Sequence, residues 1–247
     1  MPDSLARLRR DIVACDRCPR LRRWCRQVAR VKVRRHRGER YSGRPVPGFG
    51  DPRARLLVVG LAPAAHGANR TGRVFTGDRS GDFLFAALHR AGFASQPQSR
   101  HARDGLRLAD AFVTPIVRCA PPSNKPTRGE ILRCRDYLER EWALLGPRLA
   151  AVLVLGRLAM DGLAAMLRDV GRLPPRPRLA FGHGVTHDLG GGLCLFCSYH
   201  PSQQNTFTGR LTPRSFDAVL RKVRTHLARS TPSPTPHPRR RRPMREP

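Results

Sequence analysis

The sequence is poor in acidic and aromatic side chains, and it has no long apolar run. Among 247 residues, 18 Asp and Glu face 47 Lys and Arg, which gives a formal net charge of +29, and aromatic residues make up only 6%. No apolar stretch reaches the roughly 18 residues that a membrane-spanning helix needs, so no membrane contact is expected. A positive excess of this size instead predicts a polyanionic partner, most simply a nucleic acid.

An export signal and an even set of cysteines are also missing. The N-terminus, MPDSLARLRRDIVACDRC, has no uninterrupted apolar core and no cleavage site of small residues, so we expect no secretory signal. Seven cysteines, an odd number, then argue against a disulfide framework. They indicate metal ligands, a metal cluster or buried thiols.

Apolar runs alternate with helical patterns along the chain. The runs predict buried strands at residues 55–60, 112–117, 150–156 and 193–198. Helical periodicity predicts helices at residues 1–14, 81–92, 127–142, 158–167 and 213–227. Residues 171–192 are expected to form a loop or a hairpin. The alternation predicts an α/β fold, a single three-layer α/β/α domain around a mostly parallel sheet of about four strands.

Two segments carry much of the positive charge. Residues 17–40 hold eleven Lys and Arg against one acid, Glu39, and fit either a solvated, partly mobile face or a strip of phosphate contacts. Residues 229–247 hold six prolines and six arginines without apolar periodicity. A disordered tail that adds nonspecific affinity for phosphates is expected there, so the folded domain should span residues 1–228.

Four cysteines have spacings that suit a metal site. Cys15 and Cys18 form a CxxC motif, and fourteen residues separate Cys119, at a strand end, from Cys134 in the following helix. A helix that folds back beside its strand can bring these sulfurs together. Four thiolates suit zinc or a [4Fe–4S] cluster, and the spacing does not separate the two. Buried thiols without a metal are the plainer alternative.

The other three cysteines do not fit a metal site. Cys194 and Cys197 lie three residues apart in a predicted strand, where they point to opposite faces of the sheet. Cys25 has no partner at a ligand spacing. We interpret these three as core or incidental residues.

Three loops at the ends of predicted strands concentrate polar side chains. They are GLAPAAHGANRTGRVFTGD (60–78), RCAPPSNKPT (118–127) and HPSQQNTFTGR (200–210). The Asn124 carboxamide matches the edge of a nucleobase, and the Phe75 ring offers a surface on which a base stacks. The Asp78 carboxylate can orient water, and His200 can stabilise negative charge on a departing base. This set suits hydrolysis of the N-glycosidic bond of a flipped nucleotide.

Each of these side chains also has a purely structural reading. Asp78 is placed to cap a helix, Asn124 to close its own proline-rich turn, and His200 to end a strand.

Together the motifs resemble the uracil-DNA glycosylase superfamily, specifically its iron–sulfur branch, family 5 or type b. The resemblance spans residues 15–213, and the 60–78 motif is its most specific part. It implies a structural [4Fe–4S] cluster on Cys15, Cys18, Cys119 and Cys134, with zinc as the lesser alternative. It also implies a monomeric base-excision repair enzyme, in the cytoplasm and at the nucleoid of a bacterial-type cell. Such an enzyme removes uracil and other deaminated bases from DNA and leaves an abasic site.

The resemblance also implies roles for single residues. Ala62 stands where many relatives carry a polar residue and cannot activate water, so we assign that role to Asp78, with Asp82 as its local rival. Phe75, Asn124, Gly60, Ala62 and His200 would line the base pocket. Residues 203–210 would wedge into the duplex. Expected DNA contacts are Asn69, Arg70, Arg73, Ser202, Gln203, Asn205 and Arg210.

Two other functions fit parts of the sequence. A noncatalytic nucleic-acid-binding protein with structural zinc would explain the charge and the cysteines, but not Asp78, Asn124 and His200 on converging loops. A nucleotide-binding enzyme is disfavoured because GxxxxGK[ST] is absent. Apart from Lys125, no lysine in these loops stands out as a nucleophile that could form a Schiff base. We therefore expect a monofunctional enzyme without lyase activity.

Overall fold

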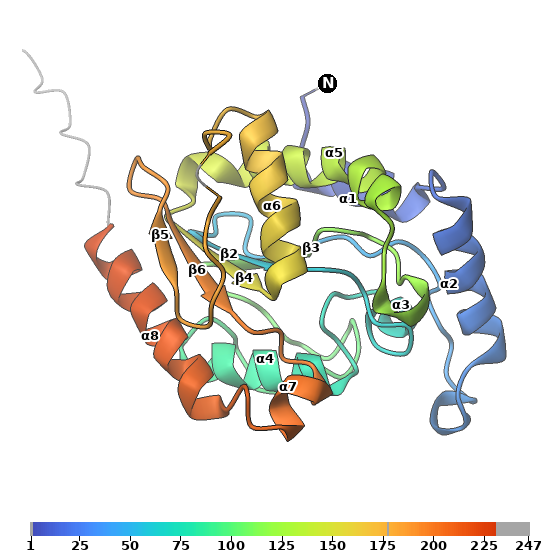
Figure 1. Cartoon of the computed structure of the whole chain (residues 1–247). Helices are drawn as coiled ribbons and strands as arrows, with labels where there is room; N and C mark the ends of the chain where they lie inside the picture. Colours follow the sequence, from blue (N-terminus) through green and yellow to red (C-terminus); the bar gives the residue numbers. More distant parts are fainter. Residues whose placement is uncertain (1, 177, 231–247) are drawn as a thin grey trace, which may run out of the picture.

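The computed structural model describes residues 2–176 and 178–230, which are built around one six-stranded sheet (Figure 1). The strand order is β1-β3-β2-β4-β6-β5. The four central strands run parallel, and the two edge strands pair antiparallel with their neighbours. The strands are β1 (Phe49–Gly50), β2 (Leu56–Gly60), β3 (Ala111–Pro115), β4 (Ala151–Leu155), β5 (Thr186–Asp188) and β6 (Cys194–Ser198).

The four parallel strands are the four predicted apolar runs, each confirmed to within two residues at either end. Almost every residue in them is buried, because helices cover both faces of the sheet. The edge strand β1 was not predicted, whereas β5 lies within residues 171–192, where a loop or a hairpin is expected, and it pairs antiparallel with β6. They are two and three residues long and only partly buried, so they carry no apolar run that a sequence pattern could reveal.

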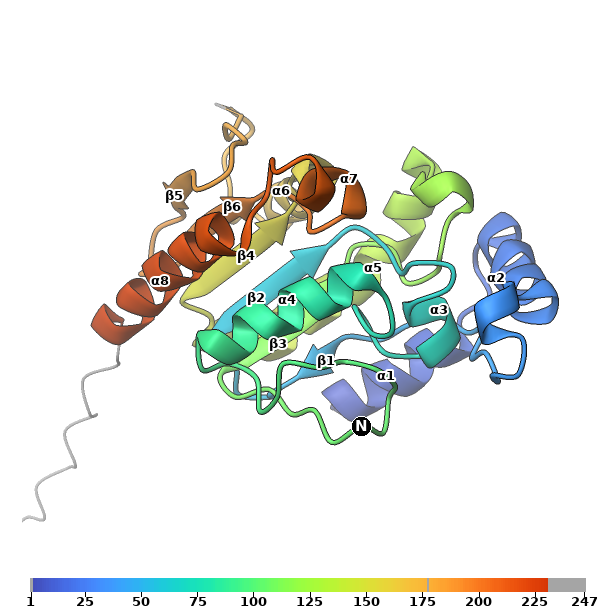
Figure 2. The same ribbon diagram turned by 90° about the horizontal axis from the view of Figure 1, so that it is seen from below.

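Helices form a layer on each face of the sheet. Figures 1 and 2 show α4 and α8 on one face and α5 and α6 on the other. The longer helices are α1 (Leu5–Ala14), α2 (Pro19–Val31), α4 (Arg79–Arg90), α5 (Arg128–Leu145), α6 (Arg157–Asp169) and α8 (Pro213–Arg229). The shorter ones are α3 (Ala68–Thr71), α7 (Gln203–Phe207) and the 3₁₀ turns η1 (Arg34–His36), η2 (Pro122–Asn124) and η3 (Gly146–Arg148).

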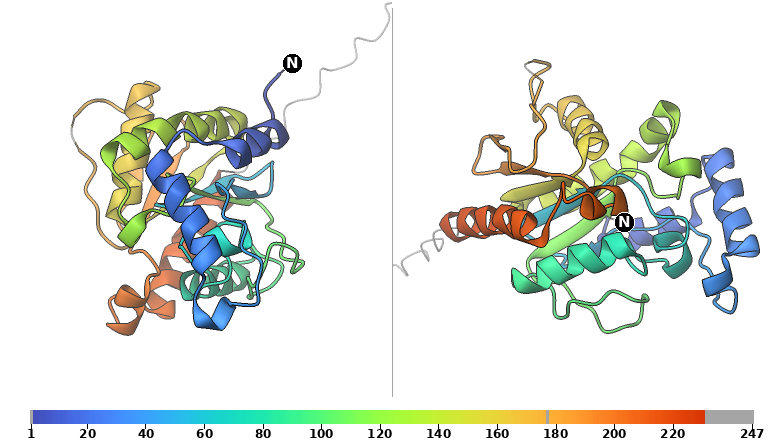
Figure 3. Two further views of the ribbon diagram at one scale, coloured as in Figure 1. Left: turned by 90° about the vertical axis from the view of Figure 1, so that its right-hand side faces the viewer. Right: turned by 60° about the horizontal axis from the view of Figure 1, so that its bottom comes forward.

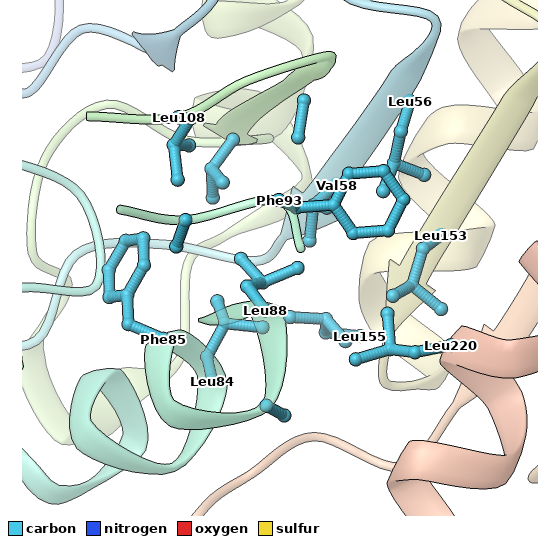
Figure 4. Close-up of a cluster of buried hydrophobic side chains, with 14 of the residues drawn as sticks. Leu56, Val58, Leu84, Phe85, Leu88, Phe93, Leu108, Leu153, Leu155 and Leu220 are labelled. Carbon is cyan, nitrogen blue, oxygen red and sulfur yellow. The ribbon is translucent and has the colours of Figure 1, made fainter. Parts of the chain in front are cut away.

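The period of two along each strand divides the core between the two faces. Leu56 and Val58 point toward α4 and α8, where they meet Leu84 and Leu220 (Figure 4). Alternate residues, such as Leu57, belong to the second cluster, beneath α5 and α6. The three-layer α/β/α architecture is therefore confirmed.

The same alternation decides whether the two cysteines of β6, Cys194 and Cys197, can share a metal ion. Cys194 packs against the cluster under α4 and α8, whereas Cys197 lies in the cluster under α5 and α6. The two thiols are on opposite faces of the sheet, as predicted, and cannot hold one metal ion together.

Residues 17–40 are more ordered than one of the two sequence readings allowed. Most of them form α2 and η1, and α2 buries Leu21, Cys25 and Val28 on one side. Apart from the buried Arg22, its arginines are exposed. The outer side of this segment is a solvated face, and its use as a strip of phosphate contacts stays a prediction.

The last helix, α8, ends at Arg229, one residue beyond the predicted C-terminal end of the folded domain at residue 228. The expected tail lies outside the described residues from 231 onward, so the division of the chain there stays a prediction. Among the described residues, no helix combines the length and the apolarity needed to cross a membrane.

Candidate active site

The loops that follow the parallel strands meet at one edge of the sheet. Because β2, β3, β4 and β6 run in the same direction, their carboxyl ends lie side by side. The predicted motif loops leave β2, β3 and β6 there. In open parallel sheets this edge is the usual place for a ligand.

Two buried arginines hold the first of these loops, residues 60–78, in shape. The Arg70 guanidinium donates to the carbonyl oxygens of His66 (2.8 Å) and Gly77 (2.7 Å) and pairs with Glu39. Arg73 forms an ion pair with Asp104 at 2.7 Å, in which both side chains are at most 8% exposed. Because these donors are used inside the protein, the loop has a fixed backbone before any ligand binds.

Asn69 has the same internal role. Its side chain is 1% exposed and donates to the backbone oxygens of Cys25 (3.4 Å) and Ala65 (3.3 Å). Asn69, Arg70 and Arg73 were expected to contact DNA, but in this structure their polar groups position the loop. Their contact with DNA stays a prediction, and α2 and η1 present more accessible cations.

Phe75 lies at the end of β2 against the ring of His200. The two ring centroids are 5.8 Å apart, with an interplanar angle of 32°. Gly60 makes room for this arrangement, because a Cβ at that position would lie 2.7 Å from the Phe75 ring. Phe75 itself has a positive φ of 49°, which turns its side chain back over the strand end. These two predicted pocket residues are thus brought together by the fold.

Asp78 is the N-cap of α4. Its Oδ1 accepts the backbone N–H of Gly81 at 2.9 Å, so the structural reading of this residue holds. Burial raises the pKa of the carboxyl group above its usual value, against the effect of the backbone N–H groups of Gly81 and Ser80. Its rival Asp82 is exposed, one turn farther along the helix. Burial therefore distinguishes Asp78 from Asp82.

A glycine that the sequence analysis passed over makes room for Asp78. A Cβ on Gly67 would overlap the second carboxylate oxygen, Oδ2. The only sequence signal for this role is that Gly67 lies inside the long 60–78 motif, since nothing local demands a glycine there.

His200 lines a pocket of about 300 Å³ at the ends of β4 and β6, together with Leu61, Tyr199 and Arg210. Burial lowers the pKa of the imidazole to about 4, so the ring is neutral at pH 7. It can therefore donate one N–H to a developing anion but does not bring a positive charge.

The loop after His200 is held by two of the predicted DNA contacts. The Asn205 side chain donates to the His200 carbonyl at 2.8 Å, and Arg210 lies 4.3 Å from the centroid of the Tyr199 ring. Ser202 is the N-cap of α7, and Gln203 is exposed at its start. Ser202, Gln203 and the exposed Arg210 can still offer polar groups to a ligand.

Asn124 is exposed in the turn η2, with a positive φ of 57°. Its backbone N–H bonds to the Pro121 carbonyl at 3.2 Å, which matches the turn-closing reading. In the described part of the chain, no hydrogen bond or ring contact joins Asn124 to Phe75, Asp78 or His200. Its contact with a base stays a prediction, as does that of Ala62, which packs beside the second core cluster.

The four predicted ligand cysteines come from three places in the fold. Cys15 and Cys18 flank the junction of α1 and α2, Cys119 follows β3, and Cys134 lies in α5. Cys18, Cys119 and Cys134 are buried in one cluster, and the Arg118 backbone N–H points at the Cys134 sulfur from 3.5 Å. Within residues 2–176 and 178–230, no three His, Cys, Asp or Glu side chains converge as they would around a single metal ion.

Comparison with known proteins places this geometry in a family. A model described as the uracil DNA glycosylase superfamily matches residues 47–224. The chain belongs to that superfamily. It is 51% identical over 221 residues to a type-5 uracil-DNA glycosylase of Mycobacterium bovis, covering 90% of this chain and 81% of the relative.

Two further relatives carry the same description. A type-5 uracil-DNA glycosylase of Thermus thermophilus is 50% identical, covering 86% of this chain and 94% of the relative. One of Mycobacterium leprae is 49% identical, covering 90% and 95%. The resemblance read from the motifs is thereby confirmed.

Replacing Gly67 by alanine should impair the site although no polar side chain is replaced. The added Cβ overlaps Asp78 Oδ2, and a displacement of about 1 Å at a reacting group can lower kcat/KM about 100-fold. Kinetics of base release would measure the loss. Gly129→Ala is the matched control, because its Cβ meets only the flexible end of Arg133 at 3.7 Å. Equal activity of the two variants would contradict the positioning role.

The pKa of His200 should be lower than that of a free histidine, because the ring is shielded from water. NMR of the ring nitrogens is expected to give a pKa of about 4 rather than the usual value near 6.5. The unfolded chain takes up this proton at higher pH than the folded chain, so the contribution of His200 to stability is full above about pH 6.5 and is lost as pH falls toward 4. His200→Asn should remove this part of the pH dependence. A measured pKa of 6 or more would contradict a half-buried ring that is neutral at pH 7.

Proposed function

We propose that this chain is a monofunctional uracil-DNA glycosylase of base-excision repair that hydrolyses the N-glycosidic bond of a flipped uracil and leaves an abasic site. The observation that carries the proposal is the contact of Phe75 with His200 at the end of β2, with Asp78 at the end of the same loop. The names of the type-5 relatives supply the substrate class. Other deaminated bases are included in the proposal.

Each residue has a defined part in the reaction. The base stacks on Phe75, with Asn124 reading its edge, and is held away from bulk water. Asp78, as a carboxylate, orients the water that attacks the sugar carbon and offsets positive charge that builds up there. As the bond to the base breaks, the electron pair stays on the base, and the neutral His200 stabilises it by donating one N–H.

The raised pKa of Asp78 has a direct consequence for this reaction. Since the carboxylate form orients water, activity falls once Asp78 is protonated. That acid limb lies above the pH at which an ordinary aspartate titrates, about 3.9.

The segment 203–210 is the proposed wedge into the duplex. Its helix α7 ends at Phe207, whose side chain is 65% exposed and lies beneath the Arg79 guanidinium, 5.2 Å from ring centroid to carbon. An exposed aromatic ring at the rim of a DNA-binding site suits insertion between base steps. We place the enzyme as a monomer in the cytoplasm, at the nucleoid.

We also propose a [4Fe–4S] cluster on Cys15, Cys18, Cys119 and Cys134. Four thiols from three segments suit the coordination of such a cluster, and a backbone N–H directed at Cys134 is typical of its surroundings. We propose the cluster rather than zinc because the motifs resemble the iron–sulfur branch of the family. When bound, the cluster would act structurally, tying the α1–α2 junction to the loop after β3 and to α5.

Excision of uracil should depend on Asp78. We expect the full-length protein to release uracil from an oligonucleotide, giving strand breaks after alkali, and Asp78→Asn to lower the rate about 10²–10⁴-fold. Asparagine caps helices as well as aspartate does, so the variant should remain folded. Asp82→Asn is the control and should stay within about threefold of wild type.

Three results would count against this assignment. Full activity of Asp78→Asn would move the water-orienting role elsewhere. Strand cleavage without alkali that depends on Lys125 would contradict a monofunctional enzyme. Inactivity of the folded wild type on uracil and on hypoxanthine would favour a noncatalytic DNA-binding protein.

The cluster is tested by its composition. The purified protein should be brown, with about four iron and four sulfide per chain. Cys134→Ser should lose iron and melt at a lower temperature, whereas Cys194→Ser should keep its iron, because Cys194 lies on the opposite side of the sheet. A colourless protein with one zinc per chain would contradict the proposal.

A further inference from the structure

Helix α2 and the turn after it carry a row of arginines without carboxylate partners. We call residues 19–40 the basic arm. The one acidic residue of the arm, Glu39, forms ion pairs with Arg70 and His36. The adjacent Asp16 forms ion pairs with Arg22 and Arg26. Within the described chain, the remaining exposed arginines of the arm form no ion pair: Arg23, Arg30, Arg34, Arg35, Arg37 and Arg40.

Two of these arginines, Arg23 and Arg30, lie on one side of α2, and the other four follow in η1 and the residues after it. Arg23 and Arg30 are seven residues apart, which is two turns of helix and about 10 Å along its axis. Between them runs an open groove of about 680 Å³, lined by Asp16, Arg22, Arg23, Arg26, Gln27 and Arg30. The opposite side of α2 is buried, so this basic side faces outward.

The arm is fixed to the loop that carries Phe75 and Asp78. Glu39 pairs with the buried Arg70, and directly after the arm the Tyr41 hydroxyl lies 3.1 Å from Nδ1 of His66. Figures 1 and 2 both place α2 beside α3, which is part of that loop. The basic side of the arm is therefore held at a set position relative to the candidate active site.

We propose that the basic arm binds the phosphate backbone of duplex DNA on one side of the flipped nucleotide. The inference deepens the proposed function and rests on it. Guanidinium groups pair well with phosphate oxygens, and a duplex presents about one charge per 1.7 Å of its axis, so a row about 10 Å long meets several phosphates. Arginines are the most frequent residues in the lining of the groove, which suits contacts that position DNA rather than read its sequence.

The protein has a second basic surface that serves as a matched control. Arg53 and Arg148 lie at the amino ends of β2 and β4, and with Arg229 they line another groove. This surface is at the edge of the sheet opposite the active site. Figure 3 (right) shows α8, which carries Arg229, and α2 at opposite ends of the molecule. Removing three charges there changes the net charge as much as removing three from the arm.

The test compares Arg23→Gln/Arg30→Gln/Arg34→Gln with Arg53→Gln/Arg148→Gln/Arg229→Gln in the full-length protein. Binding to an undamaged 20-base-pair duplex is measured by fluorescence anisotropy over a range of salt concentrations. Each lost phosphate contact lowers the slope of log K against log salt by about 0.9, so the arm variant should lose about 2–3 from the slope and the control less than about 1. The KM for uracil-containing duplex should rise in the arm variant only.

The outcomes separate this inference from the proposed function. An equal loss of slope in both variants would show a general effect of charge and overturn the arm as a binding surface, as would no loss in the arm variant. Tighter binding of wild type to an RNA duplex of the same sequence would overturn DNA as the partner. Failure of the wild type to release any base would refute the glycosylase, while the binding comparison would still decide on the arm.

Discussion

The candidate active site depends on the internal hydrogen bonds of two buried arginines. Arg70 and Arg73 neutralise Glu39 and Asp104 and hold backbone and side-chain oxygens of the 60–78 loop. Without these contacts a loop of this length could change shape. The positive φ of Phe75, which places its ring over the strand end, would then not be held by the surrounding loop. Buried charges are costly unless paired, so each ion pair also restricts the loop to the conformation that completes it.

The sequence predicts the fold well because the central strands are buried on both faces. Continuous apolar runs mark such strands, and glycine and proline mark the loops between them. The edge strand β1 is not predicted, and β5 is expected only as part of a loop or a hairpin, because their two and three residues have no apolar pattern. Their pairing depends on neighbours far away in the chain.

The site is predictable in its chemistry but not in the use of each side chain. Phe75, Asp78 and His200 follow from residue types at strand ends. The internal role of Arg70 and Arg73 does not, because their acidic partners are each 31 residues distant, and only the tertiary fold brings them together. An arginine in a motif loop therefore fits a phosphate contact and a structural clamp equally well until its partner is known.

Asp78 joins the site to the core of the protein. As the N-cap of α4 it starts the helix whose Leu84, Phe85 and Leu88 pack under the sheet (Figure 4). The carboxylate cannot turn away from the site without uncapping that helix. Its orientation is consequently fixed during folding, and substrate binding loses little free energy to ordering it. Preorganisation of this kind makes the site rigid, so its choice among bases has to come from shape and hydrogen bonding rather than from adaptation to each one.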